Sequence, residues 1–364
     1  MRVSVPSLPR AILSTKSTTP SVSPQEAIHR LSEFIEPGNV TLITGAGVSV
    51  DSGIRAYRGQ DGRYMNPNYK PILYHEFIGE GDQGRLFRYW AYHRLRSYLG
   101  YPPVRDAQPN TTHYALAALQ YTNHIPRIIT QNVDGLHHKA FLSKTAALNS
   151  RVLELHGSLH RVVCRSGHVI DRETFQDRLS VANPEWKSFA DNIEHTGTRL
   201  RTNPDGDVAI EHLGPSYNTF VVPDCPHCLS ESRMNVSVKP AFIFFGESIP
   251  EDTKIEAVQD VEASDRVLLI GTTLATYSSF RLVKHALELK KPVVMLNIGP
   301  TRADTLPGII KISLPAGLVM RDVAKAVIGS KSQDLVVHDM LRSGVVKPPP
   351  PDPRIAHIDA TESA

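Results

Sequence analysis

Residues 127–137 read RIITQNVDGLH, in which a short apolar run changes abruptly to a polar one. The first four residues, 127–130, predict a buried strand, and Gln131, Asn132 and Asp134 follow it with a turn-forming Gly135. In open parallel sheets, ligands bind at the carboxyl ends of the strands, where these polar side chains would lie. Because Asn-x-Asp-Gly is also ordinary turn chemistry, this stretch alone fits a binding site and a plain turn equally well.

A second strand ends in polar residues a short way downstream. Residues 152–155 form an apolar run that is followed by His156 and Gly157. A histidine can act as a general base because its unperturbed pKa lies near neutrality. A strand-end histidine that only hydrogen-bonds to backbone is the alternative. The two neighbouring segments together favour a functional site.

Length and composition limit the class of protein. The 364 residues are 41% hydrophobic and 21% charged, which is typical of a globular chain long enough for two domains. Forty basic residues against 37 acidic ones give a net charge of +3, and no basic stripe indicates a nucleic-acid partner. No apolar run is long enough to span a bilayer, so we expect no membrane partner. We expect the chain to act as a monomer.

The N-terminal segment has a targeting composition. Residues 1–24 contain Arg2, Arg10 and Lys16, many Ser and Thr residues and no acidic residue. This composition is typical of an organellar transit peptide and predicts import into the mitochondrial matrix. A disordered N-terminal tail is the alternative. Ordered structure should begin near residue 24, where Ser23 can cap a helix.

A glycine-rich turn follows the first predicted strand. Residues 40–43 are apolar and lead directly into Gly45, Ala46, Gly47 and, two residues later, Ser49. Such a turn brings backbone amides close to a pyrophosphate at the start of a helix. The third glycine of the dinucleotide fingerprint is missing, so the pattern alone is weak.

All three cysteines belong to one predicted metal site. Cys225 and Cys228 form a Cys-x-x-Cys pair, and Cys164 precedes them by a long turn-rich interval, residues 165–224, that predicts a small irregular domain. Thiolate and imidazole ligands suit tetrahedral zinc, and reduced cysteines without metal are the alternative. The candidates for the fourth ligand are His168, His160 and His227.

The sequence returns to an α/β pattern after the cysteine pair. Residues 241–247 (AFIFFGE), 265–274 (DRVLLIGTTL) and 292–300 (PVVMLNIGP) predict three buried parallel strands, with helices between them. The predicted fold is a Rossmann-like doubly wound parallel sheet with a smaller inserted zinc-binding domain. Its parts are a transit peptide (1–24), the Rossmann-like domain (25–62, 104–160 and 239–330), an aromatic-rich helical and loop cover segment (63–103), the zinc-binding domain (161–238) and a proline-rich disordered tail (344–364).

Taken in order, the motifs resemble the sirtuin family of NAD-dependent protein deacylases. The resemblance runs from about residue 40 to about residue 304, and other pieces, including GRYMNPNYKPI and NPEW, look like the class II branch found in mitochondria. The matching motifs are GAGVSVDSGIRAYR, TQNVDGLH, ELHGS, PDCPHC, KPAFIFFGE, GTTLATYSS and LNIGPTRAD.

The resemblance implies a role for each candidate residue. His156 would be the general base that deprotonates a ribose hydroxyl of NAD, while Asn132 and Asp134 would sit in the nicotinamide and ribose pocket beside Gln131. An acyl-lysine protein would be the substrate, NAD a co-substrate, and one zinc ion structural. The other implied contacts are Gly45, Ala46, Gly47, Ser49, Tyr57, Arg58, Gly271, Thr272, Ser278 and Asn297 for NAD, and Phe244, Phe245 and Gly246 for an extended peptide.

This chain departs from the family pattern in two places. Residues 53–58 read GIRAYR where the family usually has Gly-Ile-Pro-Asp-Phe-Arg, which leaves a mono-ADP-ribosyltransferase or a non-catalytic NAD-binding module as alternatives. The first zinc pair of the family is Cys-x-x-Cys, whereas Gly167 stands at the second position here, so we expect His168 to replace the thiolate. Four residues near a possible acyl pocket are Tyr89, Tyr92, Arg94 and Arg96.

Overall fold

The computed structural model describes residues 22–58, 62, 73–74, 97–142, 151–197, 219–233 and 238–349. The expectations for residues 1–21, for most of the cover segment with Tyr89, Tyr92, Arg94 and Arg96, and for residues 350–364 lie outside these ranges.

The larger sheet is parallel throughout, and its strands follow the order β3-β2-β1-β7-β8-β9. The direction of winding reverses between β1 and β7, which makes the carboxyl ends of these two strands the expected binding crevice. The predicted Rossmann-like sheet is thereby confirmed. Its strands are β1 (Val40–Thr44), β2 (Arg127–Thr130), β3 (Val152–Glu154), β7 (Arg266–Ile270), β8 (Val293–Leu296) and β9 (Ile309–Ile312).

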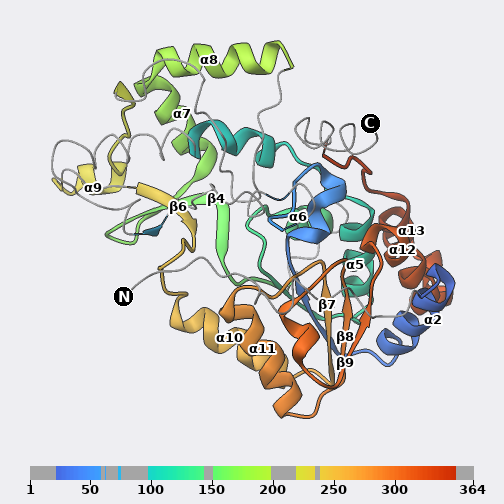
Figure 1. Cartoon of the computed structure of the whole chain (residues 1–364). Helices are drawn as coiled ribbons and strands as arrows, with labels where there is room; N and C mark the ends of the chain where they lie inside the picture. Colours follow the sequence, from blue (N-terminus) through green and yellow to red (C-terminus); the bar gives the residue numbers. More distant parts are fainter. Residues whose placement is uncertain are drawn as a thin grey trace, which may run out of the picture.

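Helices cover both faces of the larger sheet (Figure 1). Successive side chains of a strand point to opposite faces, so Leu42 enters one core and Ile43 the other. The Leu42 core contains α2 (Pro24–Ile35), α5 (Thr111–Tyr121), α6 (Leu136–Leu142), α12 (Ala316–Ile328) and α13 (Leu335–Arg342). The Ile43 core contains α10 (Glu251–Glu262) and α11 (Tyr277–Glu288). Among helices in the described ranges, none combines the length and apolar character that a bilayer span requires.

The first helix begins where the sequence predicts. The Ser23 hydroxyl accepts a hydrogen bond from the Glu26 backbone N–H at 3.2 Å, which caps α2 and contributes about 1 kcal/mol to helix stability. Ala27, Leu31 and Ile35 recur at helical spacing and are fully buried. Helix α2 is therefore held by its cap at one end and by one apolar face along its length.

A smaller antiparallel sheet has the order β5-β4-β6, with β4 (Gly157–Cys164), β5 (Val169–Asp171) and β6 (Val238–Phe242). The expectation that AFIFFGE forms a parallel strand of the larger sheet is wrong. Its first two residues end β6, which pairs with β4, and the remaining five leave the strand as a loop. The interval 165–224 contains helices α7 (Arg172–Ala182) and α8 (Pro184–His195), so it is more regular than expected. These helices and α9 (Pro226–Ser230) lie beside the smaller sheet (Figure 1).

The described part of the predicted disordered tail is bound to the fold. The Val345 N–H donates to the Pro109 carbonyl at 3.1 Å, and the Lys347 N–H donates to the Asp51 carbonyl at 2.7 Å. Backbone pairing therefore holds residues 345 and 347 of the predicted tail. Within the described ranges, the named 3-10 helices are η1 (Ala46–Ser52), η4 (Arg302–Thr305) and η5 (Gly329–Gln333).

Candidate active site

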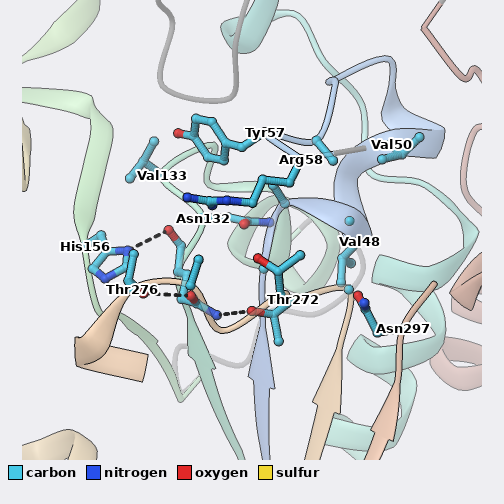
Figure 2. Close-up of a pocket in the computed structure, with 18 of the residues that line it drawn as sticks. Val48, Val50, Tyr57, Arg58, Asn132, Val133, His156, Thr272, Thr276 and Asn297 are labelled. Carbon is cyan, nitrogen blue, oxygen red and sulfur yellow. Dashed lines mark hydrogen bonds between the residues drawn. The ribbon is translucent and has the colours of Figure 1, made fainter. Parts of the chain in front are cut away.

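A cavity of about 800 Å³ lies at the carboxyl ends of the strands of the larger sheet, within the usual size range of ligand sites. Its walls come from the glycine turn after β1, the loops after β2, β7 and β8, and the segment that follows β6 (Figure 2). The predicted site residues that line it are Gly45, Ala46, Gly47, Tyr57, Arg58, Gln131, Asn132, His156, Phe244, Phe245, Gly246, Gly271, Thr272, Ser278 and Asn297.

The glycine turn packs backbone against backbone at the switch point. The Gly45 N–H donates to the Ile270 carbonyl at 3.2 Å, and the Gly47 N–H donates to the Gly271 carbonyl at 2.9 Å. A Cβ atom at Gly47 would lie 2.8 Å from the Gly271 Cα, so no larger residue fits without a shift of the chain. This close approach explains why the turn needs glycine although the third fingerprint glycine is absent.

Gln131 is held at both ends of its side-chain amide. Its Nε2 donates to the Thr272 hydroxyl at 2.8 Å, and the Thr276 hydroxyl donates to its Oε1 at 3.3 Å (Figure 2). The Nε2 also donates to the Thr44 carbonyl at 3.0 Å. Gln131 therefore joins the ends of β2 and β7 and has a fixed orientation. Thr276 was not singled out from the sequence, because a threonine in a loop carries no signal of its partner.

Ser49 and Asp134 lie one layer behind the cavity wall rather than among the lining residues. The Asn132 Nδ2 donates to the Ser49 hydroxyl at 3.2 Å, and this hydroxyl donates to the Asp134 carboxylate at 2.7 Å. Burial raises the pKa of Asp134, against the opposing effect of hydrogen bonds from the Leu136 N–H and Ser49. In this structure Asp134 thus orients Asn132 through Ser49.

His156 presents one ring nitrogen as a hydrogen-bond acceptor. Its Nδ1 lies 3.2 Å from the Gln131 carbonyl, which can only accept, so Nδ1 carries the proton. Its Nε2 therefore accepts from the Ser278 hydroxyl at 2.9 Å, at the cavity wall. Surrounding protein desolvates the ring and lowers the pKa of His156 to about 4, although the bond to Gln131 acts in the opposite direction. The imidazole is neutral at physiological pH, as a general base must be.

The four expected metal ligands come together at the end of the smaller sheet. The Cys164 and Cys228 sulfurs lie 3.7 Å apart, and the His168 Nδ1 lies 3.7 Å from the Cys225 sulfur and 3.3 Å from the Cys228 sulfur. All four ligand atoms are within 4.8 Å of one another. Tetrahedral zinc with Zn–S bonds of 2.3 Å separates its ligands by roughly 3.5–3.8 Å. The cluster therefore fits one structural zinc ion, with His168 as the fourth ligand.

The surroundings of the cluster support this choice of histidine. The His168 Nε2 lies 3.5 Å from a Glu231 carboxylate oxygen, the type of partner that orients a ligating imidazole. The His227 ring packs against the His168 ring at 5.4 Å but supplies no ligand atom to the cluster. His160, the third candidate, is elsewhere, with its Nε2 2.8 Å from the Asp134 carbonyl.

Comparison with known proteins places the chain in a family. The model of the Sir2 family matches residues 45–278, which include the glycine turn, His156 and the zinc ligands. The chain belongs to the Sir2 family. This sirtuin is 40% identical over 313 residues to the NAD-dependent protein deacylase SIR4 of Batrachochytrium dendrobatidis, covering 83% of this chain and 95% of the relative.

Further relatives extend across kingdoms. The NAD-dependent protein lipoamidase sirtuin-4, mitochondrial, of Bos taurus is 35% identical over 292 residues, covering 79% of this sirtuin and 82% of the relative. Among solved structures, a mutant Sir2 homologue in complex with ADP-ribose is 24% identical and covers 84% of this chain and 98% of its own, with a TM-score of 0.57. A Sir2 homologue in complex with NAD is 23% identical, covers 82% of this chain and 93% of its own, and has a TM-score of 0.53. The fold is that of Sir2 proteins.

A buried hydroxyl and histidine network supports Asn132 from behind. The Thr44 hydroxyl donates to the Thr130 Oγ1 at 2.9 Å, so it accepts from the His137 Nε2 at 3.0 Å. The Thr130 Oγ1 also accepts from the Asn132 backbone N–H at 3.1 Å, and the His113 ring lies 4.9 Å from the His137 ring. The sequence did not reveal this network. His137 is followed directly by His138, and the pair has the appearance of polar residues at the start of a helix.

His137 makes the stability of this sirtuin sensitive to acid. Burial lowers the pKa of His137 to about 3 from 6.5, so the unfolded chain binds more protons between these two values. The contribution of the neutral His137 ring to the free energy of unfolding is complete above pH 6.5, and it is lost as the pH falls toward 3. Between pH 7 and pH 5 the loss is about 2 kcal/mol. The measurement is the free energy of unfolding in urea at pH 7 and pH 5. We expect it to fall about 2 kcal/mol more in the natural protein than in His137→Gln.

The matched control for this measurement is His285→Gln, because the His285 side chain on α11 is 29% exposed, whereas His137 is buried. It should keep the acid sensitivity of the natural protein. An equal fall in stability for His137→Gln and the natural protein would contradict the assignment.

Proposed function

We propose that this sirtuin is an NAD-dependent protein-lysine deacylase that converts acyl-lysine, NAD and water to lysine, nicotinamide and O-acyl-ADP-ribose. The observation that carries the proposal is the neutral His156, whose acceptor Nε2 lies in the wall of the same cavity as the glycine turn and the segment after β6. The candidate base thus shares one cavity with the turn that would bind the pyrophosphate and the segment that would face the peptide.

The residues that line the cavity fit NAD along its length. An acyl-lysine oxygen can attack the ribose carbon of NAD that carries nicotinamide, and nicotinamide then leaves. The glycine turn, with Gly45 and Gly47 packed on the end of β7, would hold the pyrophosphate, and Asn297 at the end of β8 would face the adenosine half. Asn132, fixed by Ser49, would contact the nicotinamide side, and Gln131 would orient the ribose.

His156 would move the proton in the second half of the reaction. Its Nε2 would take the proton of a ribose hydroxyl, which frees that oxygen to attack the acyl carbon. Its Nδ1–H would remain on the Gln131 carbonyl, so the ring keeps its orientation and the positive charge that develops has a fixed partner at 3.2 Å. The Ser278 hydroxyl occupies the acceptor position at 2.9 Å before the substrate arrives.

The substrate, the domain division and the location form the remainder of the proposal. An extended acyl-lysine peptide would pair with the segment that contains Phe244, Phe245 and Gly246, a strand-addition mode of recognition. The chain would divide into a Rossmann-like NAD-binding domain and an inserted zinc-binding domain. The composition of residues 1–24 and the mitochondrial relative of Bos taurus support a mitochondrial matrix protein.

The proposal is tested by nicotinamide release from NAD with a panel of lysine peptides that carry acetyl, short, acidic and long acyl groups. Release that depends on the acyl group, with formation of the deacylated peptide, would support the proposal and name the acyl class. Release only with unmodified protein acceptors that become labelled with ADP-ribose would favour the transferase alternative. NAD binding without release would contradict both enzymatic functions.

A further inference from the structure

A partly buried ion pair lies directly beside the peptide-facing segment. The Lys239 Nζ is 3.0 Å from the Glu247 Oε1, and the two side chains are only 13% and 15% exposed. Lys239 lies in β6, whereas Glu247 follows the loop of residues 243–246 and lines the cavity. The pair therefore joins the two ends of this loop.

The same two side chains bind the backbone of the loop and of the strand before it. The Lys239 Nζ donates to the carbonyls of Pro240 at 3.2 Å and Phe242 at 3.0 Å. The Glu247 Oε2 accepts from the Phe244 N–H at 2.9 Å, and the Glu247 N–H donates to the Phe244 carbonyl at 3.0 Å. Hydrogen bonds to charged groups are stronger than neutral ones, so the pair fixes the path of the backbone.

The start of the loop is attached to the base. The Ile243 N–H donates to the His156 carbonyl at 2.9 Å, and a Cβ atom at Gly157 would lie 2.2 Å from the Ala241 carbonyl oxygen. The Lys239 ammonium also lies 5.3 Å from the centroid of the Phe244 ring. One end of the loop is thus hydrogen-bonded to the backbone of His156, and the other end is held by the Lys239–Glu247 ion pair.

We propose that Lys239 and Glu247 are positioning residues that hold residues 243–246 in the conformation with which an extended acyl-lysine peptide pairs. The inference rests on the proposed deacylase function and adds the residues that shape its peptide site. Neither side chain needs to touch the reacting atoms. Their effect reaches the substrate through backbone groups that are ordered before the peptide arrives.

Preorganisation of the loop has a specific kinetic consequence. Without the ammonium group, the Glu247 carboxylate and two carbonyls lose their common partner, and the loop must be ordered when the peptide binds, which weakens binding. A substrate without flanking residues makes no strand pairing and would not sense the change. In the proposed function NAD would bind on the glycine turn, which neither Lys239 nor Glu247 contacts through the bonds described, so the KM for NAD would also stay unchanged.

Lys239→Met removes the charge and keeps the length of the side chain. For the full chain, we expect kcat/KM to fall about tenfold for an acyl-lysine peptide, and less than about twofold for an end-blocked single acyl-lysine. The matched control is Arg127→Met. Arg127 pairs with Asp260 at 3.5 Å with similar exposures of 15% and 13%, but at the amino end of β2. It should lower the unfolding temperature without any selectivity between the two substrates.

Three outcomes would overturn the inference: equal losses for peptide and single acyl-lysine, unchanged kinetics for both, or the same selective loss in Arg127→Met. If Lys239→Met does not fold, Glu247→Gln keeps the shape of its side chain and takes the same test. If the natural protein turns over neither substrate, the proposed function fails instead. Fluorescence anisotropy of a labelled acyl-lysine peptide then decides the positioning role, and equal affinities of natural and variant protein would contradict it.

Discussion

Replacing His156 by alanine is expected to lower deacylation turnover by about 10²–10⁴-fold, because the reaction loses the group that takes the ribose proton. Among the described residues, the Ser278 hydroxyl is the group that donates to Nε2, and a hydroxyl is too weak a base to replace the imidazole. The unfolding temperature should change little, because the ring lies on the cavity wall and outside the apolar cores of the sheet. Mass spectrometry of the deacylated peptide, with calorimetry of the variant, measures both effects.

The matched control is His285→Ala, which removes an imidazole from α11, away from the cavity-lining residues. It should keep natural turnover. Near-natural turnover in His156→Ala would sink the assigned role of His156. A loss in both variants, accompanied by lower unfolding temperatures, would point to stability rather than chemistry.

Loss of the metal site is expected to have the largest effect on stability. Cys225 and Cys228 are fully buried, so Cys228→Ala should abolish zinc binding and release the link between β4 and α9. Structural zinc contributes about 10–16 kcal/mol of binding free energy in small zinc-finger peptides, which exceeds the stability of many domains. We expect Cys228→Ala to purify without zinc and to unfold at a much lower temperature than the natural protein.

The histidine ligand is tested separately, by metal analysis of two neighbouring variants. His168→Ala should bind zinc more weakly and lose it to a mild chelator. His227→Ala should keep one zinc ion per chain, because the His227 ring packs against the His168 ring and supplies no ligand atom to the cluster. Unchanged zinc retention in His168→Ala, or loss of zinc in His227→Ala, would reverse the assignment of the fourth ligand.

Strands β1, β2, β3, β7 and β8 were predictable because each is a short apolar run followed by polar or glycine residues, as in residues 127–131 and 266–271. Strand β9 was not predicted, because Lys311 interrupts its apolar run. The run AFIFFGE has the same appearance, yet its first residues end a strand of the smaller sheet. A short apolar run does not encode which sheet it joins, since that depends on partners far along the chain. The pairing of β6 with β4 could not be read locally.

The zinc ligands were predictable because, unlike a short apolar run, thiolates and imidazoles at defined spacings have few other uses. His168 followed from Gly167, which leaves no ligand at the position of the missing cysteine. Proline content predicts disorder after residue 343, and the backbone hydrogen bonds of residues 345 and 347 to Pro109 and Asp51 have no signature in that composition. The support of Asn132 by Ser49 and Thr130 depends on contacts between distant strands and has no local signature.

The pairing of β4 with β6 also bears on how fast the chain can fold. It brings Cys164 opposite Val238, although a long segment that includes α7, α8 and α9 lies between them. Closing such a loop costs chain entropy before any contact forms, and non-local pairing slows folding. Once a zinc ion joins Cys164 to Cys225 and Cys228, the loop that remains to be closed is only the segment between Cys228 and β6. Zinc supplied early in refolding would therefore accelerate assembly of the smaller sheet, and with it the junction at which His156 meets Ile243.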